Sequence, residues 1–495
     1  MNKQAFNPFL PVGEYIPDGE PHIFGDRVYL YGSHDNEGGW TFCMGDYTVY
    51  SAPVNDLTDW RREGVIYRAA QDPDSSTERR YMYAPDVVQG NDGRYYLYYC
   101  MSGEFGFGGY YGPIQVAVCD SPAGQFEYLG YVRWPDGTPM KKYVCFDPCA
   151  FNDNGRIYLY YGTQYPDESN EILANDSEQM SEVMERYDKT AEEILSTPEN
   201  VNGAIVAELE DDMLTVKGQP HHIIPYEADF GGHEFFEASS MRKVRDKYFF
   251  VYSSQYNHEL CYAVSDYPDR DFTFGGTIVS NGDIGVNGVT EDCRMNMTGT
   301  THGSIIEING QWYVFYHCLT HKSDYSRQAC AEPIEITPDY RIKQAEITSC
   351  GLNGGPLEGK GTYPAVIACY ITNGNMPHGA NKIFDHSFPN VTHETFPGRD
   401  TERFIAEISD GTLIGYKYFS FDEPVNISLT VRGEGDGKFL VFTDLKGEAV
   451  SELETAPAAD WQTVSAPLSI SAGTHPIYLI YRGTGMTALK DISFE

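Results

Sequence analysis

One short pattern of hydrophobic and polar positions recurs along the first two thirds of the chain. A turn rich in Asn, Asp and Gly is followed by alternating aromatic and aliphatic residues that end near a tyrosine, as in GDRVYLY at residues 25–31. Such turns before an alternating apolar run are typical of β-hairpins. The tyrosines that close the repeats are 62 to 92 residues apart: Tyr31, Tyr98, Tyr160, Tyr252 and Tyr316.

Five repeats of this kind predict the five blades of a β-propeller. A single blade cannot cover its own apolar faces, so the blades stack around a common axis. A long β-sandwich with tyrosine-rich hairpins is the alternative. The longest interval contains an acidic segment with helical periodicity, from about residue 167 to 200. We expect a helical insertion there, with its charges on a solvated face.

The composition and pattern of the sequence change after residue 350. A connection rich in Gly and Pro spans residues 351–357, and short alternating runs return at residues 425–431 and 477–481. Alternating runs separated by Gly, Asp and Asn turns predict a small β-sandwich. We therefore expect an all-β chain, with a five-bladed propeller over residues 1–372 and a β-sandwich over residues 373–495.

The charge of the chain limits its partners. The 495 residues include 35 Lys and Arg against 72 Asp and Glu, a formal net charge of −37. Such a surplus repels nucleic-acid phosphates and anionic membrane surfaces. No apolar stretch approaches the roughly 18 residues of a membrane span. We expect no nucleic-acid partner and no membrane, and a neutral or cationic partner instead.

Two features bear on the compartment. A secretory signal has a positively charged segment followed by an apolar one. The opening residues, MNKQAFNP, do not show this pattern. The 11 cysteines are scattered and form no CxxC pair. Scattered cysteines of this kind are typical of reduced thiols in a reducing compartment. The sequence therefore predicts a cytoplasmic protein.

Several carboxylates occupy equivalent positions in the repeats. Asp18, Asp147 and Glu237 each stand shortly before the repeat strand of a blade, and Asp86 is the matching residue of the second blade. The loops of a propeller converge at one end of its axis, so these side chains could meet. Each one alone could simply cap a turn. Together they offer the protonated acid and the ionised base that glycoside hydrolysis needs.

The sequence around these carboxylates resembles glycoside hydrolase family 43. The resemblance covers about residues 5–370 and rests on five blocks: DGEPH at 18–22, YAPD at 83–86, FDP at 146–148, FEAS at 236–239 and HGSI at 302–305. It implies a five-bladed propeller that hydrolyses arabinose- and xylose-containing glycans with inversion. Asp18 would then be the general base, Asp147 would orient the acid and tune its pKa, and Glu237 would be the general acid.

The chain departs from the family pattern at two of these blocks. Many members have Glu-Gly-Pro at the acid, where this chain has Glu237-Ala238-Ser239, so Glu234 is a rival for the acid. Many members have Pro-Ser after the base, where this chain has Gly19-Glu20, so Glu20 is a rival for the base.

Further residues are candidates for binding. By the resemblance, His302 would lie near a metal ion, usually calcium, in the central channel, and no organic cofactor is implied. Trp40 and Phe42 could form a stacking wall for a sugar ring, or could pack between blades. Arg294 could contact a sugar hydroxyl, or form a surface ion pair, and Asp86 is a candidate for substrate binding.

The leading interpretation is an inverting glycosidase that removes terminal xylose or arabinose from neutral, plant-type oligosaccharides. The alternatives are an endo-acting arabinanase, a retaining fructan hydrolase on the same propeller, and a non-catalytic glycan-binding propeller. The fructan hydrolase would need an Asn-Asp-Pro-Asn block and a Glu-Cys acid, and the sequence has neither. The C-terminal sandwich resembles carbohydrate-binding modules, with Tyr416, Tyr418 and Phe419 as a candidate sugar platform.

Overall fold

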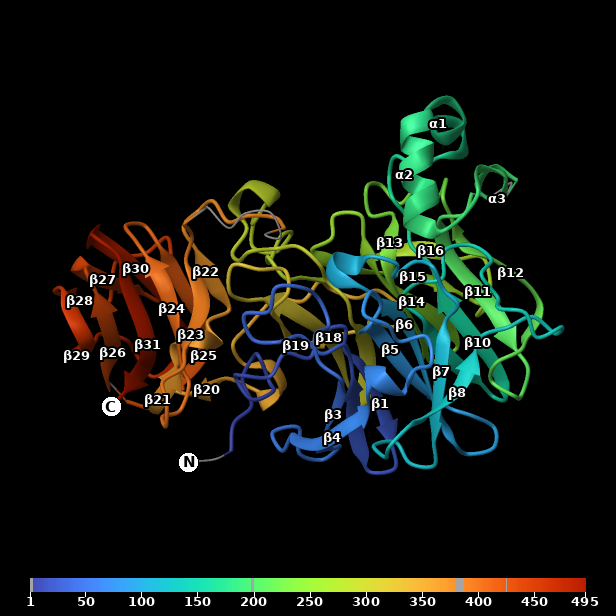
Figure 1. The fold of residues 1–495 in the computed structure, drawn as a ribbon. Coiled ribbons are helices and arrows are strands. Elements are labelled where there is room, and N and C mark those ends of the chain that lie inside the picture. The colour runs from blue at the N-terminus through green and yellow to red at the C-terminus, as the bar shows by residue number, and fades with distance from the viewer. Residues whose placement is uncertain (1–2, 197–199, 380–386, 424) are drawn as a thin grey trace.

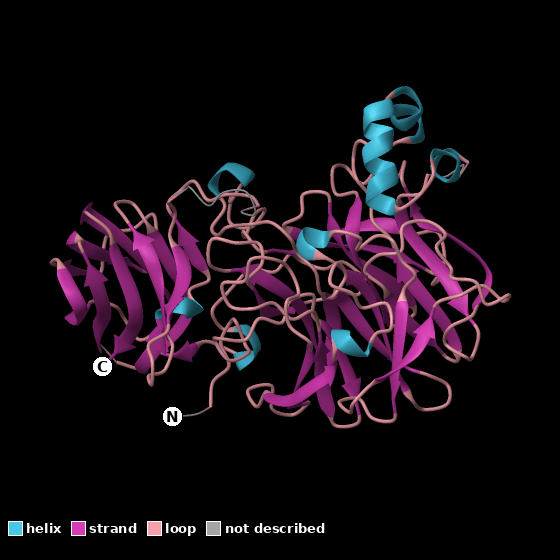
Figure 2. Ribbon diagram, in the orientation of Figure 1, coloured by secondary structure: helices cyan, strands magenta, loops and turns pink. Residues whose placement is uncertain are grey.

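The computed structural model describes residues 3–196, 200–379, 387–423 and 425–495. They form two β-rich domains that lie side by side, with few helices (Figures 1 and 2). Among the described residues, no helix is long and apolar enough to cross a bilayer.

The larger domain is a five-bladed β-propeller, as the sequence predicts. Its blades are antiparallel sheets whose strands follow chain order; four blades have four strands and the last has three. The strands are β1 (Glu20–Phe24), β2 (Arg27–Tyr31), β3 (Tyr47–Pro53), β4 (Arg61–Tyr67); β5 (Tyr81–Gln89), β6 (Tyr95–Ser102), β7 (Gln115–Cys119), β8 (Glu127–Tyr131); β9 (Cys149–Asp153), β10 (Arg156–Tyr161), β11 (Gly203–Leu209), β12 (Val216–Pro225); β13 (Phe235–Val244), β14 (Lys247–Ser254), β15 (Glu259–Ser265), β16 (Thr273–Ser280); and β17 (Ser304–Ile308), β18 (Gln311–Leu319), β19 (Arg327–Ile334).

The tyrosines of the sequence repeat lie in the packed interior of the propeller. Each repeat tyrosine lies on the second strand of its blade and is almost completely buried. The first strands contact one another in a ring, in the order β1, β5, β9, β13, β17 and back to β1. These five strands therefore surround the propeller axis.

The N-terminal segment closes the ring. The side chain of Asn7 donates to the carbonyl of Ala331 in β19 at 3.0 Å and accepts from the N–H of the same residue at 3.0 Å. The N–H of Phe9 donates to the carbonyl of Ala329 at 3.1 Å. These bonds cover the free edge of the three-stranded blade, which would otherwise expose unpaired backbone groups.

A helical insertion interrupts the third blade, as expected. It comprises α1 (Asn170–Asn175), α2 (Ser177–Tyr187) and α3 (Ala191–Leu195), which project from one end of the propeller (Figure 1). Asp176 caps α2 by accepting from the N–H groups of Glu178 and Gln179. The buried residues Met180, Val183 and Tyr187 recur at helical spacing, so one face of α2 packs on the propeller.

The smaller domain is a sandwich of two six-stranded sheets. One sheet contains β20 (Leu357–Glu358), β22 (Tyr370–Thr372), β25 (Leu413–Phe421), β27 (Asp436–Phe442), β28 (Ser451–Thr455) and β30 (Gly473–Thr484). The other contains β21 (Gly361–Pro364), β23 (Asn390–Glu394), β24 (Glu402–Ile408), β26 (Val425–Gly433), β29 (Ala458–Leu468) and β31 (Thr487–Phe494). Apolar side chains from both sheets fill the space between them.

The structure corrects two expectations about this domain. Strands β20, β21 and β22 already pair with sandwich strands, so the sandwich begins near residue 357 and not at 373. The proposed sugar platform does not exist, because Tyr416 and Phe419 are core residues with no exposed surface. The hydroxyl of Tyr418 donates to Glu346 at 2.8 Å, across the boundary with the propeller.

A buried ion-pair network joins the two domains. Lys417 of β25 has no exposed side-chain surface and donates to Glu346 at 2.9 Å and to Asp283 at 3.3 Å. Both carboxylates belong to the propeller side of the boundary. Tyr370 completes the network, with its hydroxyl 2.6 Å from the Lys417 amine.

Candidate active site

A cavity of about 720 Å³ opens where the first strands of the blades begin. Its lining includes Asp18 before β1, Asp147 before β9, Glu237 in β13 and His302 before β17. Residues that are more than 200 positions apart in the sequence therefore meet in one hollow. The structure thus brings together all three carboxylates that the sequence singled out.

Unusual backbone conformations aim these carboxylates. Asp18 and Asp147 have positive φ angles of 57° and 44°, a region that residues other than glycine seldom adopt. Glu237 lies in an irregular stretch of β13, where the register with β14 shifts on both sides of it, and Ala238 has a φ of 67°. Such bulges redirect a side chain out of the regular alternation of a strand.

Arg327 controls the charge of Asp18. Its guanidinium Nη1 lies 2.9 Å and 3.2 Å from the two Asp18 oxygens, and the carboxylate is nearly buried. Burial raises the pKa of Asp18, but Arg327, His302 and His317 outweigh burial and hold that pKa below its ordinary value. Asp18 is therefore an ionised carboxylate at neutral pH.

Glu237 has the opposite protonation state. Burial and the negative charge of Asp18 raise the pKa of Glu237 to about 8, although Arg327 acts against them. The pKa of Asp147 is also raised, by burial and by the charges of Glu237 and Asp18. The N–H of Ala238, next to the acid, donates to Asp147 Oδ2 at 3.1 Å. Asp18 is therefore ionised, whereas Glu237 and Asp147 both have raised pKa values, so the pocket holds an ionised carboxylate beside a protonated Glu237.

Aromatic side chains form the walls of the pocket. Phe42, which the sequence proposed as a stacking residue, lines it and lies 4.8 Å from the Arg327 guanidinium. The hydroxyls of Tyr110 and Tyr165 are 2.9 Å apart on another part of the wall. The remaining aromatic lining comprises Tyr83, Phe105, Phe107, Tyr111, Phe146 and Phe236. Aromatic rings around a few polar groups are typical of small-molecule binding sites.

Three of the predicted substrate-binding residues lie outside this pocket. Trp40 is 45% exposed and packs against Phe105 from outside. Asp86 is completely buried and its Oδ1 lies 2.6 Å from His22 Nε2. Arg294 donates to Glu291 at 2.9 Å and to Thr298 at 3.0 Å, so its charge is already paired.

The two rival carboxylates are also outside the pocket lining. Glu20 pairs with Arg242 on the axis side of β1. Glu234 accepts from the N–H groups of Phe230 and Gly232 at 3.2 Å and 3.0 Å, which is a turn-closing role. The geometry therefore favours Asp18 over Glu20 and Glu237 over Glu234.

The sequence reasoning missed several residues of the site. Strand β19 begins with Arg327. A single arginine at the start of this largely buried strand could have indicated a functional residue. Glu182, Glu185 and Arg186 of α2 line the pocket, and both glutamates are exposed, so part of the insertion's solvated charge belongs to the pocket rim. His378 and Gly379 also line it, because their segment hydrogen-bonds to Thr298 beside the pocket. Nothing in the sequence indicates that His378 and Gly379 lie close to the pocket.

His302 lies beside two buried carboxylates that could attract a cation. Its Nε2 lies 3.9 Å from Glu20 Oε1, a buried oxygen without a hydrogen-bond partner among the described residues. Its Nδ1 lies 3.5 Å from Asp147 Oδ2. Calcium takes six to eight oxygen ligands, so these residues fit a largely hydrated ion bound by the Glu20 oxygen, with His302 contacting it through water.

The chain is similar to known glycosidases over its whole length. The family model described as "Glycosyl hydrolases family 43" matches residues 7–206 and 193–341. A "Xylosidase/arabinosidase" of Thermoclostridium stercorarium is 40% identical over 511 aligned positions, which cover 100% of this chain and 99% of the relative. A "Beta-xylosidase" of Xylanibacter ruminicola is 30% identical over 67% of this chain and 96% of its own length.

A solved structure agrees with these relatives. It is a GH43 β-xylosidase/α-arabinofuranosidase from a compost microbial metagenome, described as in complex with xylotriose and in a calcium-free form. It is 26% identical, covers 70% of this chain and 98% of its own, and has a TM-score of 0.52.

Proposed function

This chain belongs to family 43 of the glycosyl hydrolases, and from this premise we propose that it removes terminal xylose or arabinose from neutral, plant-type oligosaccharides. It is a glycosidase that hydrolyses O-glycosidic bonds. The full-length relative described as a xylosidase/arabinosidase and the structural neighbour bound to xylotriose support this substrate class.

The opposite protonation of Asp18 and Glu237 in one pocket carries the proposal. Asp18 is ionised and held by Arg327, so it can accept a proton from the attacking water. Glu237 has a pKa of about 8, so at neutral pH it can donate its proton to the leaving oxygen. Asp147 lies between the N–H of Ala238 and His302 and would position the acid.

We propose that the stereochemistry is inverting. The bond from the anomeric carbon to the leaving oxygen breaks as that oxygen takes the proton of Glu237. Water adds to the opposite face of the sugar and gives its proton to Asp18. No covalent sugar–enzyme intermediate is needed, which is why a base and an acid suffice.

We also propose that calcium binds near His302, held by the Glu20 carboxylate and contacting His302 through water. When bound, the ion would supply positive charge that favours the ionised form of the neighbouring carboxylates. Two observations support this proposal: Glu20 Oε1 has no hydrogen-bond partner in the part of the chain that the structure describes, and the neighbouring enzyme is described as calcium-free. The protein's own residues carry the proton transfers.

A cytoplasmic location is a further part of the proposal. The 11 cysteines are all free thiols, and seven of them are buried. Unpaired cysteines in this number are typical of a reducing compartment. Fractionation of producing cells would test it, with recovery outside the cytoplasm as the contradicting outcome.

The function is tested with a panel of nitrophenyl glycosides and with xylo- and arabino-oligosaccharides. We expect release from β-D-xylopyranosides or α-L-arabinofuranosides and none from the matching glucosides and galactosides. Proton NMR of the first product should show the inverted anomer, α-xylose from a β-xyloside. Exclusive internal cleavage of arabinan would favour the endo-acting alternative, and no hydrolysis of any substrate would favour the non-catalytic one.

A further inference from the structure

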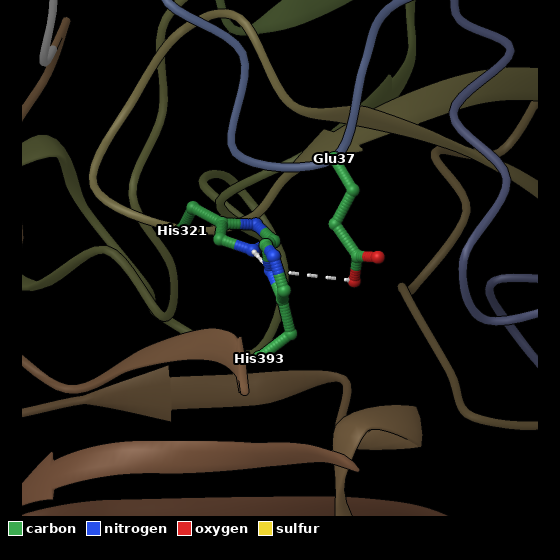
Figure 3. A group of neighbouring side chains, drawn as sticks. All are labelled: Glu37, His321 and His393. Atoms are coloured by element: carbon green, nitrogen blue, oxygen red, sulfur yellow. Dashed lines mark hydrogen bonds and ion pairs between the residues drawn. The ribbon is translucent and has the colours of Figure 1, made fainter. Parts of the chain in front are cut away.

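A group of three potential metal ligands lies at the boundary between the two domains, away from the pocket. Glu37 comes from the loop between β2 and β3, His321 from the loop between β18 and β19, and His393 from β23 of the sandwich. Figure 3 shows their side chains pointing toward one another. We propose that these three residues bind a zinc ion that fastens the sandwich to the propeller.

The distances between the ligand atoms match a zinc coordination sphere. His321 Nε2 lies 3.1 Å from His393 Nδ1, and His393 Nδ1 lies 3.7 Å from Glu37 Oε1. Two ligands at the usual Zn–N distance and a tetrahedral angle are about 3.3 Å apart. An ion can therefore enter with shifts of a few tenths of an ångström.

The surroundings of His321 fix the ring nitrogen that faces the site. The hydroxyl of Thr320 donates to the carbonyl of Ser326 at 3.1 Å, so its oxygen can accept the Nδ1–H of His321 at 3.3 Å. This tautomer leaves the lone pair of His321 on Nε2, directed at His393. A second hydrogen bond that sets the tautomer is the usual support of a metal-bound histidine.

Arg403 orients the carboxylate of Glu37. Its Nε and Nη2 donate to the two Glu37 oxygens, each at 2.7 Å. Each carboxylate oxygen has two lone pairs, and the second lone pair of Oε1 has only a long contact, 3.4 Å from the Tyr15 hydroxyl, for an ion to displace. The side chain of His393 is 28% exposed, so water can reach the site and complete four-coordination.

The backbone leaves room for the rings. Gly38 has a φ of 66°, and a Cβ at this position would lie 3.3 Å from His393 Cε1 and 3.9 Å from His321 Cδ2. The N–H of Gly38 donates to the hydroxyl of Ser326 at 3.0 Å, which joins the two propeller loops. A glycine therefore allows both histidines to approach the loop that carries Glu37.

Zinc is the ion that this ligand set favours. Two imidazoles with one carboxylate suit zinc, whereas calcium and magnesium prefer all-oxygen sites. Two other groups of potential ligands lie wholly within the propeller, and their carboxylates also accept hydrogen bonds. Glu259 accepts from His233, Ser254 and Thr277, and Asp86 accepts from His22 and two backbone N–H groups.

The ion would act on the active site through the loops it joins. The loop that carries Glu37 also carries Phe42 of the pocket wall, and the loop that carries His321 leads into Arg327. Zinc would thus hold two pocket loops and the sandwich in one arrangement. Because the ligands come from both domains, separation of the domains would release the ion.

The test uses the full chain, stripped with dipicolinate and titrated with Zn²⁺ against a chromophoric competitor, with metal content measured after gel filtration. The ligand variants are His393→Gln and His321→Asn; Asn is chosen because residue 321 has a φ of 60°, which Asn tolerates. The matched control is His475→Gln, a histidine of the same sandwich outside the group. Circular dichroism verifies that each variant is folded.

We expect one zinc per chain in the unchanged protein and in the His475 control, and close to none in both ligand variants. Zn²⁺ should raise the unfolding temperature of the unchanged protein and of the His475 control, and should leave that of the ligand variants unchanged. Co²⁺ in place of Zn²⁺ should give a visible absorption band that the ligand variants lack. Absence of stoichiometric binding at micromolar Zn²⁺, or its persistence in either ligand variant, would overturn the proposal.

Discussion

Asp18 and Glu237 are both carboxylates of one pocket, yet their neighbours give them different charges. Arg327 contacts both oxygens of Asp18, whereas Glu237 faces the negative charge of Asp18 and is partly removed from water. The pKa of Asp18 lies below its ordinary value and that of Glu237 is about 8. Environment, and not residue type, assigns the base and the acid.

The base is tested with Asp18→Asn. Asn tolerates the φ of 57° at this position, so the backbone strain is unchanged. We expect kcat to fall by about 10²- to 10⁴-fold, because the proton acceptor is lost. Calorimetry with a xylo- or arabino-oligosaccharide should show binding within a few-fold of the unchanged protein.

The control for this variant is Asp26→Asn, on an exposed turn between β1 and β2. It should leave both turnover and binding unaltered. Loss of oligosaccharide binding in Asp18→Asn would contradict its role as a base.

The acid is tested with Glu237→Gln on two leaving groups. Loss of the proton donor should lower kcat by about 10²- to 10⁴-fold on a xylo-oligosaccharide. The loss should be much smaller on a nitrophenyl glycoside, because nitrophenolate leaves without a proton. An equal loss on both substrates would argue against acid catalysis by Glu237.

The pH dependence gives a second readout of the same group. Glu237 must be protonated to act, so kcat/KM should fall as the pH rises through about 8. Asp18 must be ionised, so the acidic decline should lie below the ordinary range of an aspartate. Glu237→Gln should abolish the alkaline decline, and Glu234→Gln, the rival carboxylate, should retain it.

At the scale of elements, the active site depends on interruptions of regular structure. The register shifts of β13 turn Glu237 toward the axis, and the helical insertion adds α2 to the rim of the pocket. Arg186 of α2 forms an ion pair with Glu168 and lies 4.5 Å above the ring of Tyr165. The helix therefore supports an aromatic wall of the pocket.

We expect Arg186→Gln to weaken substrate binding and leave the chemistry intact. Loss of the cation–π contact is worth roughly 1 kcal/mol, so KM should rise by about fivefold. The value of kcat should change by less than about twofold, because Arg186 contacts no reacting carboxylate. Michaelis kinetics on oligosaccharides of increasing length would measure both.

The control is Arg61→Gln, a surface arginine of β4 whose side chain is 59% exposed. It removes the same charge far from the pocket and should leave KM unchanged. A fall in kcat without a change in KM in Arg186→Gln would contradict the proposed supporting role.

At the scale of the whole molecule, the propeller and the sandwich share buried polar groups. Lys417 enters the boundary from the sandwich, and Asp283 and Glu346 face it from the propeller. A buried charge that loses its partner is strongly destabilising, since desolvation is then uncompensated. The two domains should therefore unfold as one unit.

We expect Lys417→Met to destabilise the protein by about 3–5 kcal/mol, because Asp283 keeps its buried position without a cation. Scanning calorimetry should show the single transition of the unchanged protein split into two. Lys438→Met, which removes an exposed pair with Glu452, should cost about 0–1 kcal/mol. A Lys417 variant that unfolds in one transition at the original temperature would show that the domains are held together otherwise.

The pattern of apolar residues was enough to determine the five blades, the helical insertion and the C-terminal sandwich. Periodicity and turn residues are local, and they survive in the sequence wherever the strands end up. The motifs around Asp18, Asp147 and Glu237 likewise indicate a hydrolytic site from the sequence alone.

Only the tertiary structure decided which charged groups lie close enough to change one another's pKa, and which residues meet at the domain boundary. Arg327 lies 309 positions from Asp18 in the chain, and yet it sets the protonation of that residue. The earlier start of the sandwich, the burial of Asp86 and the approach of His378 to the pocket follow from long-range strand pairing and packing. Electrostatics and burial depend on distances in space, and residues far apart in sequence carry no local signal of them.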